Sequence, residues 1–108
     1  MLKSATIVLG SLLVLSTTGA ALAETAWEIS HPRRDQVNDR LENQDRRIHQ
    51  EVKEGELTHA QAAKLHRQDH RVREEERAMA SRHGGHITKR EQTALNRQEN
   101  RISREIGP

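Results

Sequence analysis

Apolar side chains recur from about residue 35 onward at steps of three and four residues, the period of an α-helix that buries one face. In the first such stretch, one stripe is formed by Val37, Leu41, Gln44, Ile48 and Val52. The stripe ends just before a glycine, which is a common stop signal for a helix. The spacing therefore predicts a first helix over residues 35 to 53.

The same pattern occurs again further along the chain. The stretch from Leu57 to Val72 recurs from Ile87 to Ile102, and its second half also appears upstream, from Leu41 to Ile48. Each copy contains the unit Leu-x-x-Gln-acid-x-Arg-Ile/Val. Internal repetition of this kind indicates that each copy folds into the same local structure. We therefore expect three similar helices.

Turn and capping residues separate the copies. Gly55 and Gly84 follow helical runs, where glycine favours the left-handed conformation that closes a helix. After each turn comes a threonine with Gln or Glu three residues later, which is the capping-box pattern of a helix start. These pairs are Thr58 with Gln61 and Thr88 with Glu91. The signals predict helices over residues 58 to 82 and 88 to 106.

Three helices joined by short turns run up, down and up. The expected fold is therefore all-α, with three antiparallel helices in two helical hairpins, repeat-like, around a thin core. The chain has one Trp and no Phe or Tyr, so large apolar side chains are few. Small domains with so little to bury are marginally stable. Association into a homodimer is one way for such a fold to gain stability.

The repeated unit also makes a prediction about the interior. Its Leu, Gln and Ile/Val are spaced three and then four residues apart, which is the seam of a coiled coil with glutamine inside it. The glutamines are Gln44, Gln68 and Gln98. Each would then pair across a helix interface. The alternative is that all three are half-exposed on narrow helices, and the spacing alone does not decide between the two.

The start of the chain has the parts of a secretory signal peptide: Lys3 in a basic start, an apolar run, and a small-residue site at Ala23. The apolar run is well short of the roughly 20 residues of a spanning helix. We expect cleavage after Ala23. The predicted organisation is a signal peptide over 1–23, a flexible N-terminal tail over 24–34 and a helical repeat domain over 35–108.

Composition narrows the class of protein. Export predicts a periplasmic or secreted location, with no membrane span left after cleavage, and the absence of cysteine means that no disulfide forms. The 18 Lys and Arg residues are interleaved with 16 Asp and Glu residues. Interleaved charge is typical of solvated helix faces and argues against a nucleic-acid partner.

Pro32 disfavours helix at the residue before it, which is why 24–34 is interpreted as a tail.

The stretch from Leu57 to Gln61 reads Leu-Thr-x-x-Gln, and the stretch from Ile87 to Glu91 is a near copy. Exported, charged, helical and free of cysteine, the chain resembles the Spy/CpxP/ZraP periplasmic proteins. This resemblance implies work in envelope stress, either by binding unfolded clients on a helical cradle or by binding metal. The whole chain also resembles small exported proteobacterial proteins of unassigned function, which share Gly-x-Leu/Ile-Thr-x-x-Glu turns and Gln-rich helices.

Seven histidines are many for a chain of this size. His59, His66 and His70 lie at i, i+7 and i+11 and so follow one face of the second helix. His66 and His70 form an i,i+4 pair suited to Zn²⁺, Cu²⁺ or Ni²⁺, and His49 or Asp45 approaches from the first helix. The candidate metal ligands are therefore His59, His66, His70 and His49. The alternative is that these histidines are polar residues on a wet surface and that no cofactor is bound.

Signals for catalysis are missing from the sequence. It has no cysteine, Gly-x-Ser-x-Gly elbow, phosphate loop or His-Glu-x-x-His motif, so no catalytic residue is assigned and we expect a protein that is not an enzyme. The expected function is a small exported helical binding protein, a stress-related accessory or chaperone-like factor with unfolded or envelope proteins as partners. The alternatives are a periplasmic metal-binding protein that uses the histidine stripe and a structural, envelope-associated helical protein.

Overall fold

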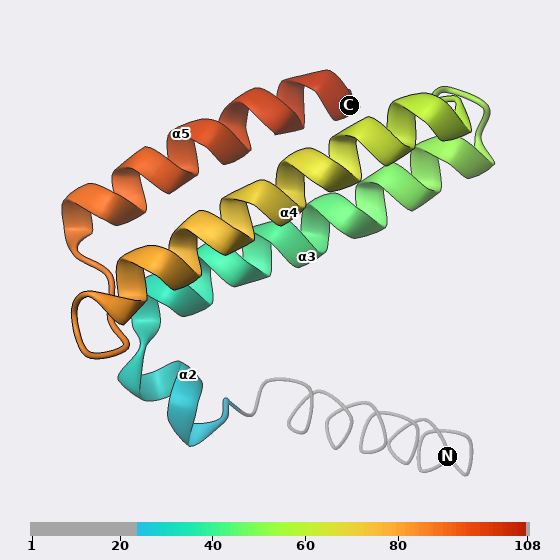
Figure 1. Cartoon of the computed structure of the whole chain (residues 1–108). Coiled ribbons are helices and arrows are strands. Elements are labelled where there is room, and N and C mark those ends of the chain that lie inside the picture. The colour runs from blue at the N-terminus through green and yellow to red at the C-terminus, as the bar shows by residue number, and fades with distance from the viewer. Residues whose placement is uncertain (1–23, 108) are drawn as a thin grey trace, which may run out of the picture.

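The computed structural model describes residues 24 to 107, and this part of the chain is all-helical, as expected. The expected signal peptide lies outside the described residues. The described helices are α2 (Ala26–Ser30), α3 (Pro32–Lys53), α4 (His59–Ser81) and α5 (Lys89–Ile106). In Figure 1, α3 and α4 run antiparallel, and α5 runs back in the direction of α3. The three long helices pack against one another in all three pairs.

The long helices α4 and α5 begin at the capping boxes that the sequence contains. Thr58 Oγ1 accepts from the Gln61 backbone N–H at 3.0 Å, and Gln61 Oε1 accepts from the Thr58 N–H at 2.8 Å. Thr88 and Glu91 make the same pair of bonds at 3.1 and 2.8 Å. The hydrogen bond from the Thr88 backbone also lowers the pKa of Glu91. Each box thus satisfies donors that the first turn of a helix leaves without partners.

The segment 24–34 is helical where the sequence suggested a flexible tail, and it raises the number of described helices from the expected three to four. Thr25 and Glu28 form a third capping box, with bonds of 2.7 and 3.1 Å, at the start of α2. Pro32 lies in the first turn of α3, where its missing N–H costs no helical hydrogen bond. Proline therefore starts α3 while it keeps His31 out of both helices.

Glycine allows the chain to reverse between the long helices. Gly55 has a φ of 80° and Gly85 a φ of 95°, values in the left-handed region that side chains with a Cβ rarely adopt. The Gly85 N–H donates to the carbonyl of Ala80 at 2.8 Å and closes the end of α4. Both turns lie where the sequence signals placed them.

The apolar core is a narrow strip of aliphatic side chains between α3, α4 and α5, with no aromatic ring in it. Its buried members are Val37, Leu41, Ile48, Ala62, Leu65, Val72, Ala80, Ile87, Leu95, Ile102 and Ile106. Together with the buried polar residues Gln44, Asp69, Glu76 and Glu99, the core residues of each long helix recur at steps of three and four, as in a coiled-coil seam. Because so small a core leaves little net stability, individual polar contacts around it matter more than they would in a larger domain.

Arg34 connects several elements at one end of the bundle. Its guanidinium forms an ion pair with Glu76 of α4 and donates to the carbonyl of Gly85 at 2.9 Å. It also lies 5.1 Å from the ring centroid of Trp27 in α2. The side chains of Arg34 and Glu76 are only 17% and 1% exposed. This largely dehydrated pair therefore holds α2, α3, α4 and the α4–α5 turn together.

Stacked rings attach α2 to the same turn. Trp27 stacks on His31, and His31 stacks on His86, with 4.5 Å between ring centroids in each pair. His86 belongs to the turn between α4 and α5, so the stack joins the start of the described chain to the connection of the last two helices. The Trp has specific partners here although the core excludes it.

The capping box at α4 gives a first test of the fold. Replacement Thr58→Ala removes the side-chain acceptor for the Gln61 N–H and is expected to lower the free energy of unfolding by about 1 kcal/mol. Urea denaturation followed by far-UV circular dichroism measures this change. Thr93→Ala, on an exposed face inside α5, is the control and should leave stability unchanged or slightly higher. Equal effects of the two substitutions would contradict a role for the cap.

Candidate functional site

Four polar or charged side chains lie within the described core, beside the aliphatic strip. They are Gln44, Asp69, Glu76 and Glu99, with exposed fractions of 2%, 4%, 1% and 0%. Of these, Glu76 has the Arg34 partner described above. Buried polar groups without full hydrogen bonding are costly, and in native proteins they often mark a function or a built-in instability. This buried polar layer is therefore the first candidate functional site.

The repeated glutamines are placed differently from one helix to the next. Gln44 is buried, and its Nε2 donates to the Glu99 backbone carbonyl at 2.7 Å, as the seam interpretation predicts. Gln68 and Gln98 are only half-buried, and Gln98 pairs at the rim with Glu75 at 2.8 Å. In α4 and α5 the acidic residue that follows the glutamine enters the core in its place. Pairing across a helix interface is therefore confirmed for Gln44 in the core and for Gln98 at the rim, and the half-exposed alternative fits the burial of Gln68 and Gln98.

Glu99 is the most confined of the buried acids. Neither carboxyl oxygen has a hydrogen-bond partner within the described protein, and the nearest cation, Arg40 Nη1, lies 3.7 Å from Oε1. Burial raises the pKa of Glu99 from its usual 4.5 to about 8. The charges of Asp69 and Glu76 act in the same direction, while those of Arg40 and Arg73 partly oppose it. Near neutral pH, Glu99 is therefore mostly a neutral carboxylic acid in the folded state.

Asp69 of α4 has a similar environment. Burial raises its pKa well above the usual 3.8, and the neighbouring Asp45 carboxyl of α3 raises it further. The charge of Arg73 opposes both. The core thus holds two acids, one on α4 and one on α5, that both favour protonation in the closed bundle and ionisation in water.

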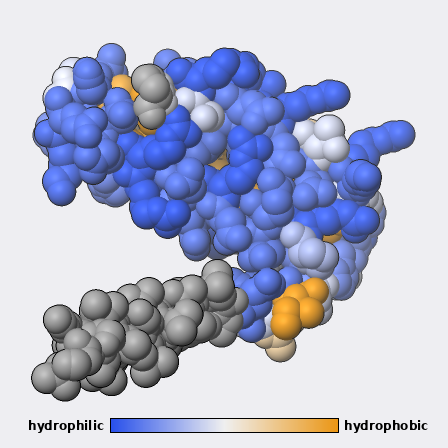
Figure 2. Space-filling view, turned by 180° about the vertical axis from the view of Figure 1, so that it is seen from behind, coloured by the Kyte–Doolittle hydropathy of each residue, from blue (hydrophilic) through white to orange (hydrophobic). Residues whose placement is uncertain are grey.

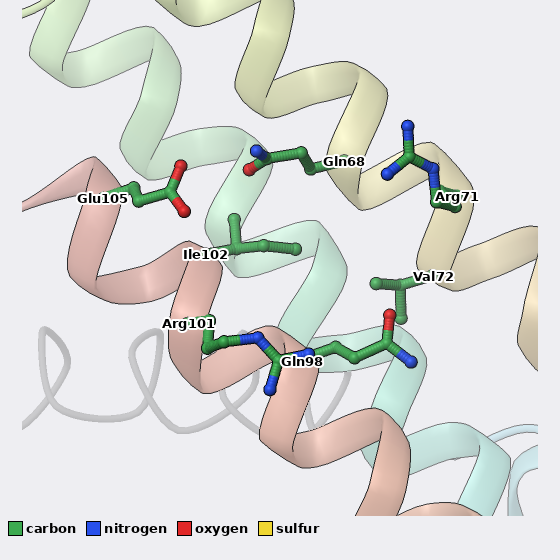
Figure 3. A pocket seen from close by; sticks show the side chains of 7 residues that line it. All are labelled: Gln68, Arg71, Val72, Gln98, Arg101, Ile102 and Glu105. Atoms are coloured by element: carbon green, nitrogen blue, oxygen red, sulfur yellow. The ribbon is translucent and has the colours of Figure 1, made fainter.

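A groove of about 150 Å³ lies at the α4–α5 interface. Figure 3 shows its lining, in which side chains of α4 and α5 face each other across the groove. The lining residues are Gln68, Arg71, Val72, Gln98, Arg101, Ile102 and Glu105. Val72 and Ile102 belong to the apolar core and are 1% and 5% exposed, so the aliphatic strip lies directly beneath a polar rim at this interface.

Polar contacts hold much of α5 in place. Arg47 of α3 donates to Ser103 Oγ at 2.7 Å and to the Ser103 carbonyl at 3.2 Å, and also to the carbonyl of Gly107. Arg40 donates to Asn100 at 2.6 Å, at an exposed position. Water can replace each of these bonds if α5 moves away, so the net contribution of each is only about 1 kcal/mol. The polar contacts of the helix that carries Glu99 are thus exchangeable with water, while its apolar face is held by burial in the core.

The outer surface offers little apolar area. Figure 2 shows a face that is hydrophilic over most of its extent, with apolar atoms gathered near α2. The large hydrophobic residues that are exposed in the described chain are Trp27, at 40%, and Ile29, at 67%. The closed bundle therefore presents no broad apolar cradle, and a client that binds apolar surface would need the aliphatic strip to be uncovered.

The structure brings together only two of the four histidines that the sequence singled out. His49 of α3 and His66 of α4 have ring centroids 5.2 Å apart, and His66 Nδ1 lies 3.1 Å from Asp45 Oδ1. His70 is exposed beside Glu74, with 3.8 Å between Nε2 and Oε1, and His59 is exposed in the first turn of α4. The structure therefore brings His49 and His66 together across two helices and leaves His70 on the outer face.

Among residues 24 to 107, no group of three or more His, Cys, Asp or Glu side chains is arranged to hold a metal ion. No helix in the same part of the chain combines the length and the apolar character needed to cross a bilayer.

No protein-family model, curated protein or solved structure matches this chain. Sequence reasoning missed the three buried acids Asp69, Glu76 and Glu99, although Asp69 and Glu99 stand in the repeated unit next to its glutamine.

Proposed function

We propose that this protein is a small exported binding protein of the cell envelope that holds unfolded polypeptide segments in a chaperone-like way. In this proposal α5 moves away from α3 and α4 and uncovers the aliphatic strip for a client. The single observation that carries the proposal is the fully buried Glu99 carboxyl without a hydrogen-bond partner. The closed bundle disfavours the charged form of this carboxyl, and opening returns the carboxyl to water.

The direction of the pH effect follows from the raised pKa of Glu99. Opening exposes the carboxyl to water, where its pKa returns to about 4.5, whereas the closed bundle holds it at about 8. Between these values opening releases one proton, so the ratio of open to closed molecules rises about tenfold per pH unit. The bundle is most firmly closed in acid and opens most readily at neutral to alkaline pH.

The chemistry of the uncovered surface supports an unfolded polypeptide as the occupant. Moving α5 exposes Leu95 and Ile102 on that helix and the facing aliphatic residues of α3 and α4, which are all buried in the closed bundle. Arginine and glutamate side chains line the groove above them, among them Arg101 and Glu105. An apolar strip with both signs of charge at its rim suits extended segments of varied sequence, because it favours no single charge on the client.

Export through the predicted signal peptide would place the protein where unfolded envelope proteins occur. Binding that follows local opening of a low-stability element is a recognised use of such elements. The proposal therefore combines the expected location, the buried Glu99 carboxyl and the aliphatic strip in one mechanism.

The experiment measures light scattering from a chemically unfolded reporter protein during refolding, with and without the purified protein at a near-equimolar ratio. Suppression of aggregation is expected, and it should increase from pH 6 to about 8 as Glu99 favours opening. Replacement Glu99→Gln keeps α5 closed and should reduce the protection at neutral pH several-fold. Glu42→Gln, at an exposed position of α3, is the matched control and should protect like the wild type.

Three results would count against this function. One is a wild-type protein that leaves aggregation unchanged at every pH. Another is a Glu99→Gln variant that protects as well as the wild type at neutral pH. The third is protection that falls as the protein concentration rises and a dimer forms, because α5 would then uncover a surface for a second copy and not for a client.

A further inference from the structure

We propose that His49 and His66 form a two-imidazole binding site for a divalent transition-metal ion, between α3 and α4. The two rings are 5.2 Å apart between centroids and inclined at 47°, so small side-chain rotations can direct one nitrogen of each ring toward a common point. His49 is exposed and the His66 side chain is 35% exposed, which gives an ion access from solvent. This inference does not rest on the opening of α5.

Asp45 orients the His66 ring for metal binding. Its Oδ1 lies 3.1 Å from His66 Nδ1, and a carboxylate only accepts, so the Nδ1–H of His66 donates to it. That hydrogen bond fixes the tautomer that leaves the Nε2 lone pair of His66 free for a ligand. Carboxylates orient metal-binding histidines in this way in many proteins, and their loss weakens metal binding about tenfold or more. Asp45 is thus a positioning residue.

The nature of the ligands selects the ion. Imidazole nitrogens favour Cu²⁺, Ni²⁺ and Zn²⁺ over Mg²⁺ and Ca²⁺, which prefer oxygen ligands. Among the first three, Cu²⁺ binds a given nitrogen site most tightly. Two protein ligands leave the remaining positions of the ion to water, in keeping with the absence of a three-residue cluster in the described chain. The site is therefore suited to exchangeable capture of copper-like ions.

This assignment differs from a stripe along α4. His70 has Glu74 as its near neighbour, with 3.8 Å between Nε2 and Oε1. His59 lies about two turns before His66, too far away to share an ion with it. The across-helix pair uses one histidine from each of two packed helices, so ion binding also links α3 to α4. Binding should therefore raise the thermal stability of the fold.

The test is a Cu²⁺ titration of the purified protein by calorimetry, with electron paramagnetic resonance on the same samples to count nitrogen ligands. One ion with two coordinated nitrogens is expected. Replacements His49→Ala and His66→Ala should each lower the affinity at least tenfold and leave one nitrogen or none, and Asp45→Asn should lower it about tenfold with two nitrogens retained. His70→Ala and His59→Ala are the matched controls and should bind like the wild type. Circular dichroism verifies that every variant stays helical.

The proposal fails if the wild type binds no Cu²⁺. It also fails if His70→Ala weakens binding as much as His49→Ala does, since the ion would then lie on the outer face of α4. Unchanged affinity in His49→Ala and His66→Ala would identify adventitious binding elsewhere. None of these outcomes bears on aggregation suppression, so the two proposals stand or fall separately.

Discussion

Replacement Glu99→Gln is expected to stabilise the protein at pH values near 8, by an amount on the order of a few kcal/mol. Glutamine has the same shape as glutamate but no charge to bury. The pKa of Glu99 is about 8 in the folded state and about 4.5 in water, so the wild type loses stability as pH rises between these values. Below about 4.5 both side chains are neutral, and the difference between variant and wild type should vanish.

Urea denaturation at several pH values, followed by far-UV circular dichroism, measures this difference. Glu105→Gln removes a charge from an exposed position of the same helix and should leave the midpoint almost unchanged. A Glu99→Gln variant that is less stable than the wild type near pH 8 would mean that the buried carboxylate is ionised and well solvated. The ratio of open to closed molecules would then not rise about tenfold per pH unit.

Replacement Arg34→Ala is expected to lower the free energy of unfolding by about 3 kcal/mol or more, because it leaves the buried Glu76 without its partner. The same change removes the hydrogen bond to the Gly85 carbonyl and the cation over the Trp27 ring. In a domain with so small a core, this loss is a large part of the total stability. Urea denaturation provides the measurement.

The neighbouring variant Arg33→Ala is the matched control. Arg33 donates to the Ile87 carbonyl at 3.3 Å from an exposed position, so its loss should cost about 1 kcal/mol or less. Adding Glu76→Gln to Arg34→Ala removes the orphaned charge and should recover part of the stability, which keeps the test valid if the single variant does not fold. Equal midpoints for Arg33→Ala and Arg34→Ala would show that the ion pair contributes little.

Much of the fold follows from local signals in the sequence. Thr58 with Gln61 and Thr88 with Glu91 define helix starts because a capping box satisfies backbone donors locally, whatever the rest of the chain does. The same logic was available for α2. Thr25 and Glu28 have the identical spacing, and Pro32 suits a first helical turn, but a helix of five residues has no apolar periodicity that would indicate it.

The buried acids were harder to predict because two choices of seam differ by only one residue. A step of three then four from Leu95 selects Gln98, and a step of four then three selects Glu99. Both reach Ile102, and hydrophobicity alone favours the glutamine. Ile106 lies four residues beyond Ile102 and is buried, so a continuous heptad through both isoleucines requires Glu99. Packing over the whole helix thus outweighed the local cost of a buried acid.

Sequence periodicity places the histidines along their helices but does not give the contacts that they make between helices. Helix periodicity correctly placed His66 and His70 near one another on α4, but the sequence contains no information on which of them faces α3. The crossing of the two helices brings His66 within 5.2 Å of the His49 ring, measured between centroids, and next to Asp45. Only packing between helices can specify such a pair, because its members lie on separate elements.

The stacking of Trp27 on His31 and His86 also determines what optical spectroscopy reports for this protein. The chain has one Trp and no Tyr or Phe, so its near-ultraviolet absorbance and its emission come from this one ring. The ring lies outside the aliphatic strip, at the junction of α2 and the α4–α5 turn. Its fluorescence therefore reports local detachment of α2. A shift in the wavelength of this fluorescence need not coincide with unfolding of the helical bundle.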